Sequence, residues 1–140
     1  MSHVARIKVR GYHLDFYGHV NNARYLEFLE EARWRMVEGS ASLREWRARG
    51  WAFLVVKVEI NYRRPAVLDD ELEIVSAVGH LGGRSGVIRQ EVRRAADGAT
   101  LADADITFVI MDVNTRKAMP IEGEIRTALT PADERDRGTA

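Results

Sequence analysis

The feature that most constrains the fold is a change of hydrophobic period along the chain. Between residues 21 and 37, apolar side chains recur every three or four positions, and charged side chains occupy the opposite side. This spacing predicts one long amphipathic helix with a single buried stripe. After residue 54 the period falls to two, which predicts strands with one buried face. The predicted buried stripe of the helix consists of Tyr25, Phe28, Leu29, Ala32 and Met36.

Strands are predicted over 4–10, 54–62, 71–78, 85–94 and 101–113, and a shorter second helix over 42–50. The connections 79–84 and 95–100 are short, and Asp97-Gly98 is typical of a hairpin turn. One-sided strands joined by hairpins form an antiparallel sheet. A sheet and a helix that each carry one apolar face bury those faces together, so we predict an α+β fold with the sheet wrapped around the long helix.

The alternation also assigns side chains to faces within single strands. In 101–113, the predicted core face carries Ala102, Ala104, Ile106, Phe108 and Ile110. In 54–62, one face is predicted to carry Leu54, Val56, Val58, Ile60 and Tyr62.

Composition limits the classes of partner and compartment. The 140 residues suit one domain, which we place at residues 1–129, with a frayed tail at 130–140 that has lost its large apolar residues. The formal net charge is zero, which argues against a nucleic-acid partner. The absence of cysteine, of a leader-like N-terminus and of a long apolar run fits a cytoplasmic protein without a membrane span.

Five polar or permissive residues stand immediately before the long helix: Asp15, Gly18, His19, Asn21 and Asn22. A helix N-terminus carries unpaired N–H groups and a partial positive charge, so it can stabilise an oxyanion. A nearby carboxylate can attack a carbonyl or activate a water molecule. Together these groups are suited to acyl transfer.

Each of these residues also has a purely structural interpretation. Asp15 can cap its own loop, His19 can bond a backbone carbonyl, and Asn21 or Asn22 can be the helix N-cap. Tyr25 begins the apolar stripe and so belongs to the core or a pocket wall. Glu31 is a second carboxylate that could act as the catalyst, but its spacing favours an ion pair with Arg35.

The runs 15-DFYGHVNNARY-25 and 31-EAR-33 resemble the 4-hydroxybenzoyl-CoA thioesterase family of hotdog-fold acyl-CoA thioesterases. The resemblance implies a hotdog fold, an acyl-CoA substrate, no cofactor, and subunits that pair their sheets edge to edge with the site at the interface. A homodimer or homotetramer is therefore expected. Asp15 matches the catalytic carboxylate and Asn22 the polarising backbone N–H.

The same resemblance implies substrate contacts at Gly18, His19, Tyr25 and Arg84. Some branches of the family carry a histidine at the position of Asn22. Because an asparagine side chain exchanges no proton near neutral pH, proton transfer falls to Asp15, water or His19. Arg84 matches basic residues that lie near the nucleotide. For the other arginines, at 63, 64, 89, 93 and 94, a solvated strand face is the simpler interpretation.

Two other functions use the same fold. A hotdog dehydratase needs a histidine followed by Pro-Gly before the helix, whereas His19 is followed by Val-Asn-Asn. A non-catalytic module that binds acyl thioesters is compatible with the sequence but leaves Asp15 unexplained. No nucleotide-binding glycine motif and no metal-ligand spacing is present, since the four histidines are scattered.

Overall fold

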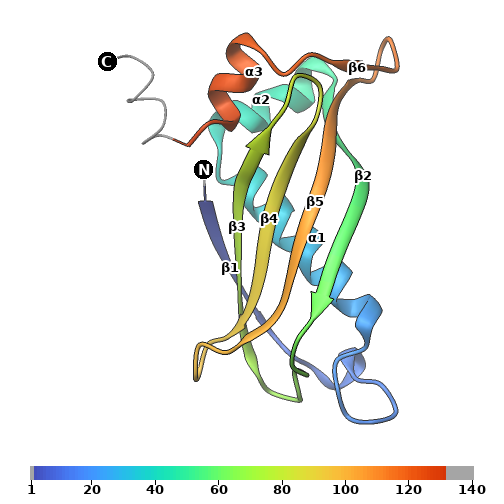
Figure 1. The fold of residues 1–140 in the computed structure, drawn as a ribbon, viewed down its shortest axis with the longest axis vertical. Coiled ribbons are helices and arrows are strands. Elements are labelled where there is room, and N and C mark those ends of the chain that lie inside the picture. Colours follow the sequence, from blue (N-terminus) through green and yellow to red (C-terminus); the bar gives the residue numbers. More distant parts are fainter. Residues whose placement is uncertain (1, 132–140) are drawn as a thin grey trace.

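The computed structural model describes residues 2–131, whose strands and helices follow the predicted order (Figure 1). The remainder of the predicted tail, 132–140, lies outside the described residues. The strands are β1 (Ser2–Lys8), β2 (Trp51–Tyr62), β3 (Glu71–Leu81), β4 (Gly86–Arg94), β5 (Thr100–Asp112) and β6 (Lys117–Met119). The helices are η1 (Gly11–His13, a 3-10 turn), α1 (Asn22–Glu38), α2 (Ala41–Arg49) and α3 (Gly123–Leu129).

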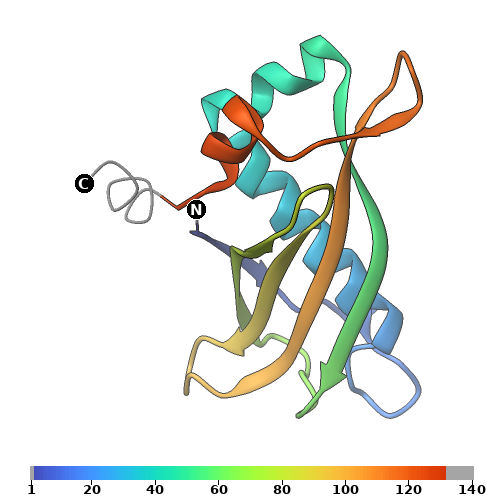
Figure 2. The ribbon, with the colours of Figure 1, turned by 45° about the horizontal axis from the view of Figure 1, so that its top comes forward.

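The strands form one antiparallel sheet in the order β1-β3-β4-β5-β2, and β6 pairs with the C-terminal end of β5. Consecutive hairpins join β3, β4 and β5, as predicted. The segment between β2 and β3 instead crosses the sheet, because β2 pairs with β5 at the far edge. The sheet curls beside α1 (Figure 2), and the α+β prediction is confirmed.

Helix α1 forms where the helical period predicts it. The side chain of Asn21 caps its start by accepting a hydrogen bond from the Ala23 N–H at 2.9 Å. The C-cap is Gly39, and α1 packs against β1, β3 and α2. The predicted stripe of five apolar residues, from Tyr25 to Met36, is buried. The end of α2 at Gly50 is also confirmed, and this glycine takes the left-handed conformation typical of a helix stop.

The face assignment within the predicted strand 54–62 is wrong on one side of a β-bulge. Val55 and Lys57 pair with consecutive residues of β5, so Val56 is an extra residue. An extra residue reverses the faces of the side chains before it relative to those after it. Val58 therefore faces the same side as the buried face of β5, whereas Leu54 lies on the other side.

β2 is an edge strand that leaves much apolar surface uncovered. Its one pairing partner among the described residues is β5, so its outer backbone groups have no neighbouring strand. Five large apolar side chains of β2 are exposed at 39–55% of their surface: Leu54, Val55, Val56, Val58 and Tyr62. A long apolar edge of this kind is a site for pairing with another strand.

Three further parts of the structure differ from the prediction. The predicted connection 79–84 is mostly strand, since β3 continues to Leu81 before the turn. Neither β6 nor α3 was predicted from the sequence. β6 has three residues, too few to show alternation. α3 buries only one i,i+4 pair, Ile125 and Leu129, which is too short a stripe to indicate a helix. Among residues 2–131, no helix is both long and apolar enough to cross a membrane.

Candidate active site

Asp15 lies in a tight loop between η1 and α1, and its carboxylate is held by the loop backbone. One carboxylate oxygen, Oδ1, accepts hydrogen bonds from the N–H of Tyr17 at 2.8 Å and of His19 at 3.2 Å. The Asp15 N–H in turn donates to the His19 carbonyl at 2.7 Å. Within residues 2–131 the other oxygen, Oδ2, accepts no hydrogen bond. The loop therefore fixes the carboxylate and leaves one oxygen available.

The loop closes through Gly18 and through short antiparallel bridges. Gly18 has a φ of +75°, and a Cβ built there would meet no atom within 4 Å. The glycine is thus required by backbone conformation rather than by lack of space. One bridge joins Leu14 to Val20, and another joins His19 to Val67. The His19 imidazole is exposed, and among the described residues it makes no hydrogen bond.

The N-terminus of α1 leaves one backbone donor without an acceptor. The N–H of Asn21 donates to the His13 carbonyl at 2.9 Å, and that of Arg24 donates to the Asn21 carbonyl at 2.9 Å. The N–H of Ala23 donates to the side-chain oxygens of Asn21 and Asn22. Among residues 2–131 the N–H of Asn22 has no acceptor, although its side chain takes part in the cap. A free, oriented donor at a helix start can bind an anion or a developing oxyanion.

Two tyrosines attach this end of α1 to the rest of the fold. Tyr25 is buried, and its hydroxyl oxygen accepts a hydrogen bond from the Ala66 N–H at 3.1 Å. The Tyr62 hydroxyl donates to the Asn22 carbonyl at 2.9 Å, and its ring lies 5.4 Å from that of Tyr25. Burial raises the pKa of Tyr25. Tyr25 therefore lies in the core, and its predicted contact with substrate stays a prediction.

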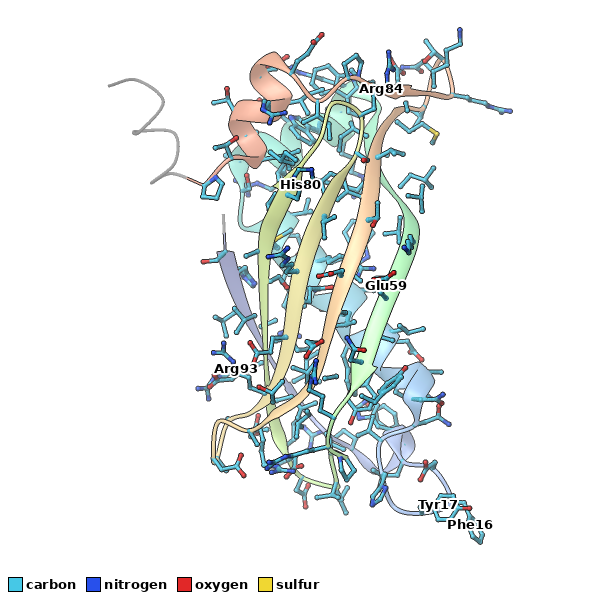
Figure 3. The ribbon with its side chains drawn as sticks, in the orientation of Figure 1. Phe16, Tyr17, Glu59, His80, Arg84 and Arg93 are labelled. Carbon is cyan, nitrogen blue, oxygen red and sulfur yellow. The ribbon has the colours of Figure 1, made fainter. Side chains whose placement is uncertain are left out.

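Sequence reasoning missed Tyr62 as a site residue. The alternation placed its side chain on the same face as Val58 and Ile60, which is correct, but gave no sign that the strand ends beside the helix start. Phe16 and Tyr17 were also missed. They form the exposed tip of the Asp15 loop, with 96% and 78% of their surface accessible (Figure 3).

His13 is a fourth residue that was not predicted from the sequence. It is buried, and its Nδ1 accepts a hydrogen bond from the Arg10 N–H at 2.8 Å. The imidazole stacks edge-on against Phe28, with ring centres 4.8 Å apart. Burial lowers the pKa of His13, and the charge of Arg24 lowers it further. His13 thus joins two backbone segments, since its ring accepts the Arg10 N–H and its carbonyl accepts the Asn21 N–H.

The competing carboxylate, Glu31, is engaged elsewhere. Its Oε1 accepts a hydrogen bond from Arg35 Nε at 3.1 Å, which confirms the predicted i,i+4 pair. Arg35 also donates to the carbonyl of Arg6 on β1 at 2.9 Å. Glu31 is therefore part of an exposed pair beside β1.

The structure does not bring Arg84 near Asp15 within one chain. Arg84 lies in the turn between β3 and β4, at the opposite end of the molecule from the loop that carries Phe16 and Tyr17 (Figure 3). Its side chain is exposed and donates one long hydrogen bond, 3.4 Å, to the Ala118 carbonyl.

The other arginines in the predicted basic clusters are mostly ion-paired on the surface. Arg63 pairs with Asp103, and Arg93 pairs with Glu91 at 2.9 Å. Arg89 and Arg94 also have acidic partners. This supports the solvated strand face as the interpretation for Arg63, Arg89 and Arg93, whereas the half-buried Arg94 side chain bonds Asp70, Asp97 and the Pro65 carbonyl. In the part of the chain that the structure describes, no group of three or more His, Asp or Glu side chains is placed to hold a metal ion.

Comparisons with known proteins identify the family of this chain. A family model described as the thioesterase-like superfamily matches residues 9–129. The long-chain acyl-CoA thioesterase FadM of Escherichia coli strain K12 is 56% identical over 124 residues, which cover 89% of this chain and 94% of that protein. Among solved structures, the probable thioesterase YbaW from Escherichia coli has 55% identity and a TM-score of 0.86, covering 90% of this chain and 95% of that one.

A more distant structure extends the likeness at the level of the fold. A Staphylococcus aureus protein, solved in complex with CoA, shares 13% identity at a TM-score of 0.80, covering 91% of this chain and 81% of that one. The match of the family model over most of the chain, and the identity to FadM over nearly its whole length, show the family directly. The chain belongs to the thioesterase-like superfamily.

Proposed function

We propose that this chain is an acyl-CoA thioesterase that hydrolyses an acyl thioester to a carboxylic acid and free CoA. The observation that carries the proposal is the N–H of Asn22 at the start of α1, which has no acceptor among residues 2–131 and follows directly after the loop that holds Asp15. The identity to a long-chain acyl-CoA thioesterase supports the substrate class. The fold that goes with this function is the hotdog, with the sheet wrapped around α1 as its central helix.

In the proposed mechanism the thioester carbonyl oxygen accepts a hydrogen bond from the Asn22 N–H. The positive end of the α1 dipole adds to this donor as negative charge develops on the oxygen. Tyr62 holds the same residue through its carbonyl, so the donor keeps its direction during the reaction. The side chain of Asn22 contributes to the cap and transfers no proton.

Asp15 supplies the reacting carboxylate by one of two routes. As a general base, Oδ2 removes a proton from water while the water oxygen attacks the carbonyl carbon, and the C–S bond then breaks to release the CoA thiolate, which takes the proton back from Asp15. As a nucleophile, Oδ2 attacks the carbon, expels the thiolate and leaves an anhydride that water hydrolyses. Both routes need only water and substrate, and no cofactor takes part.

Three of the proposed substrate contacts lie at the same end of the molecule as Asp15. Gly18 and His19 line the loop next to Asp15, where we expect them to meet the thioester and the adjoining part of CoA. Tyr25 lies one turn into α1 and stands behind this surface. Arg84 is assigned to the CoA phosphates, since a guanidinium binds phosphate in fork geometry.

The Arg84 assignment requires a second copy of the chain. We propose a homodimer, or a tetramer made from such dimers, that pairs the exposed β2 edges antiparallel. A two-fold pairing of this kind places the Arg84 end of one copy beside the Asp15 end of the other. It also covers the apolar side chains of β2. Light scattering should show at least a dimer at micromolar concentration, and a monomer of 15.9 kDa would contradict the arrangement.

A steady-state assay of the purified chain on a panel of CoA thioesters tests the function. We expect turnover on acyl-CoA with release of free thiol, and the dependence of kcat/KM on acyl length identifies the acyl group. The matching carrier-protein thioesters distinguish CoA from a protein-bound carrier. Binding without hydrolysis across the panel would favour the non-catalytic module, and hydration or dehydration of the acyl chain would favour the dehydratase.

A further inference from the structure

A buried polar residue interrupts the apolar inner face of the sheet beneath α1. Gln90 on β4 is the cross-strand partner of Ser76 on β3 and of Ala104 on β5. The exposed fractions of Ser76 and Gln90 are 0% and 2%, so this row of residues lies inside the core. On β4 itself, the neighbours of Gln90 on the same face are the buried residues Ile88 and Val92. A glutamine at such a position has to satisfy its amide within the protein.

All the bonds of this amide go to α1 or to the adjacent strand. Gln90 Nε2 donates to the Leu29 carbonyl of α1 at 2.9 Å and to the Ser76 hydroxyl oxygen at 2.9 Å. Gln90 Oε1 accepts from Arg33 Nη1, also on α1, at 3.0 Å. Both amide hydrogens and one side of the amide oxygen are thereby used. The side chain holds α1 at two points one turn apart.

Stability alone does not require this arrangement. A buried, satisfied polar group contributes little more than an apolar group of the same shape, because forming its hydrogen bonds costs the hydration of both partners. The Arg33 guanidinium adds a desolvation cost, since burial lowers the pKa of Arg33 while Glu30 opposes that effect. The hydrogen-bonded cluster of Gln90, Ser76 and Arg33 instead fixes where α1 lies on the sheet. Hydrogen bonds tolerate a narrow range of distance and angle, whereas packed apolar side chains can slide past each other.

The position of α1 on the sheet determines the position of its N-terminus. Leu29 lies seven residues after Asn22, which is about 10 Å along a helix that rises 1.5 Å per residue. A helix of this length moves as a rigid unit, so a shift at Leu29 moves the Asn22 N–H by a similar amount. A misplacement of about 1 Å at a reacting centre can cost about 100-fold in rate.

We propose that Gln90 is a positioning residue for thioester hydrolysis: by bonding the Leu29 carbonyl and Arg33 it fixes α1 along its axis, and so places the Asn22 N–H relative to Asp15. This inference rests on the proposed function. Gln90 touches neither substrate nor reacting atoms in this scheme. It acts through the helix.

Two substitutions separate positioning from support of the fold. Gln90→Met keeps an unbranched side chain of similar size and removes all three hydrogen bonds. Gln90→Glu keeps an acceptor for Arg33 but cannot donate to the Leu29 carbonyl at neutral pH. Ile88→Val is the matched control, since it loosens the same face of the same strand by one methylene without touching the cluster. For each variant, kcat, KM, the unfolding midpoint and a crystal structure are measured.

We expect kcat of both Gln90 variants to fall by about 10-fold to 100-fold, with KM within about threefold of wild type. The crystal structures should show α1 displaced relative to β3 and β4, and Ile88→Val should keep wild-type kcat. A Gln90 variant with kcat within about twofold of wild type would overturn the inference, as would a loss of kcat without displacement of α1.

The folding outcomes are equally decisive. If Gln90→Met does not fold, Gln90→Glu carries the test alone. Failure of both to fold would overturn the positioning role, because the cluster would then be a requirement of the fold. A wild-type chain that hydrolyses no thioester would overturn the proposed function instead, and the displacement of α1 in the variants would still report on the hydrogen-bonded link.

Discussion

The two ends of this molecule hold their functional side chains in different ways. At one end, two backbone N–H groups hold the Asp15 carboxylate at 2.8 and 3.2 Å, inside a loop closed by its own backbone bonds. At the other end, the exposed Arg84 side chain makes one hydrogen bond of 3.4 Å. A carboxylate that reacts has to be oriented before the substrate arrives, whereas a cation that binds phosphate can adapt to it.

Under the proposed function, this contrast assigns a different kinetic effect to each end. An oriented group changes the energy of the transition state and so affects kcat, while a distant phosphate contact stabilises substrate and transition state equally and affects KM. If both ends act on one substrate, as proposed, one chain holds only part of the site, since Arg84 and the loop with Phe16 and Tyr17 lie at opposite ends of the molecule (Figure 3). The variants below test whether the Asp15 end affects kcat and the Arg84 end affects KM, in order of expected effect.

The largest effect is expected for Asp15→Asn. The substitution keeps the size of the side chain and an oxygen for the Tyr17 and His19 N–H groups, but removes the charge and the basicity. We expect kcat to fall by at least about 100-fold, the usual cost of losing a positioned proton-transfer group, and further if the route is covalent. Stability should change by less than about 0.5 kcal/mol.

Glu31→Gln is the matched control for Asp15→Asn, since it neutralises a carboxylate that is paired with Arg35 beside β1. Its kcat should stay close to wild type. If turnover survives Asp15→Asn within about threefold and is lost in Glu31→Gln, the catalytic carboxylate is the one on the helix.

A smaller effect is expected for Tyr62→Phe. The variant keeps the ring that contacts Tyr25 and removes the hydrogen bond to the Asn22 carbonyl. One hydrogen bond contributes about 0.5–1.5 kcal/mol, so we expect kcat to fall by about 2-fold to 10-fold if the bond orients the Asn22 peptide. KM should change less than kcat. An unchanged kcat would mean that the bond has no part in placing the donor.

The two ends also differ in how much the sequence could predict. Around α1 the local signals are strong: a cap at Asn21 or Asn22 and the apolar stripe both follow from neighbours within a few residues, and the structure shows Asn21 as the cap. The Val56 bulge was unpredictable because it depends on pairing with β5, which is about 50 residues away in sequence. The contact of Tyr62 with the helix start, and the buried amide of Gln90, likewise depend on which elements meet in space. Long-range pairing leaves no local pattern, so it has to be seen in the structure.

At the Arg84 end, substitution should change KM rather than kcat. We expect Arg84→Ala to raise KM for CoA thioesters by about 3-fold to 10-fold and to leave kcat within about twofold, since a phosphate contact remote from the carbonyl is uniform binding. Arg89→Ala is the matched control, because this arginine is an exposed cation near Asp105 on β5. The difference between the two variants should shrink as salt is raised. Equal KM values for Arg84→Ala, Arg89→Ala and wild type would show that Arg84 does not bind the CoA phosphates and is an ordinary solvated arginine.

The smallest effect is expected in the pH dependence of stability at the Asp15 end. Burial lowers the pKa of His13 below its ordinary value of 6.5, so the folded protein favours the neutral ring. The unfolded chain then binds more protons than the folded protein at pH values below about 6.5, and stability falls as the pH drops from there toward the folded pKa.

In His13→Asn a side-chain oxygen can still accept the Arg10 N–H but does not titrate. The loss of thermal stability between about pH 7.5 and about pH 5 should therefore be smaller in this variant than in wild type. Identical slopes in the variant and the wild type would show that His13 does not couple protonation to the stability of this end.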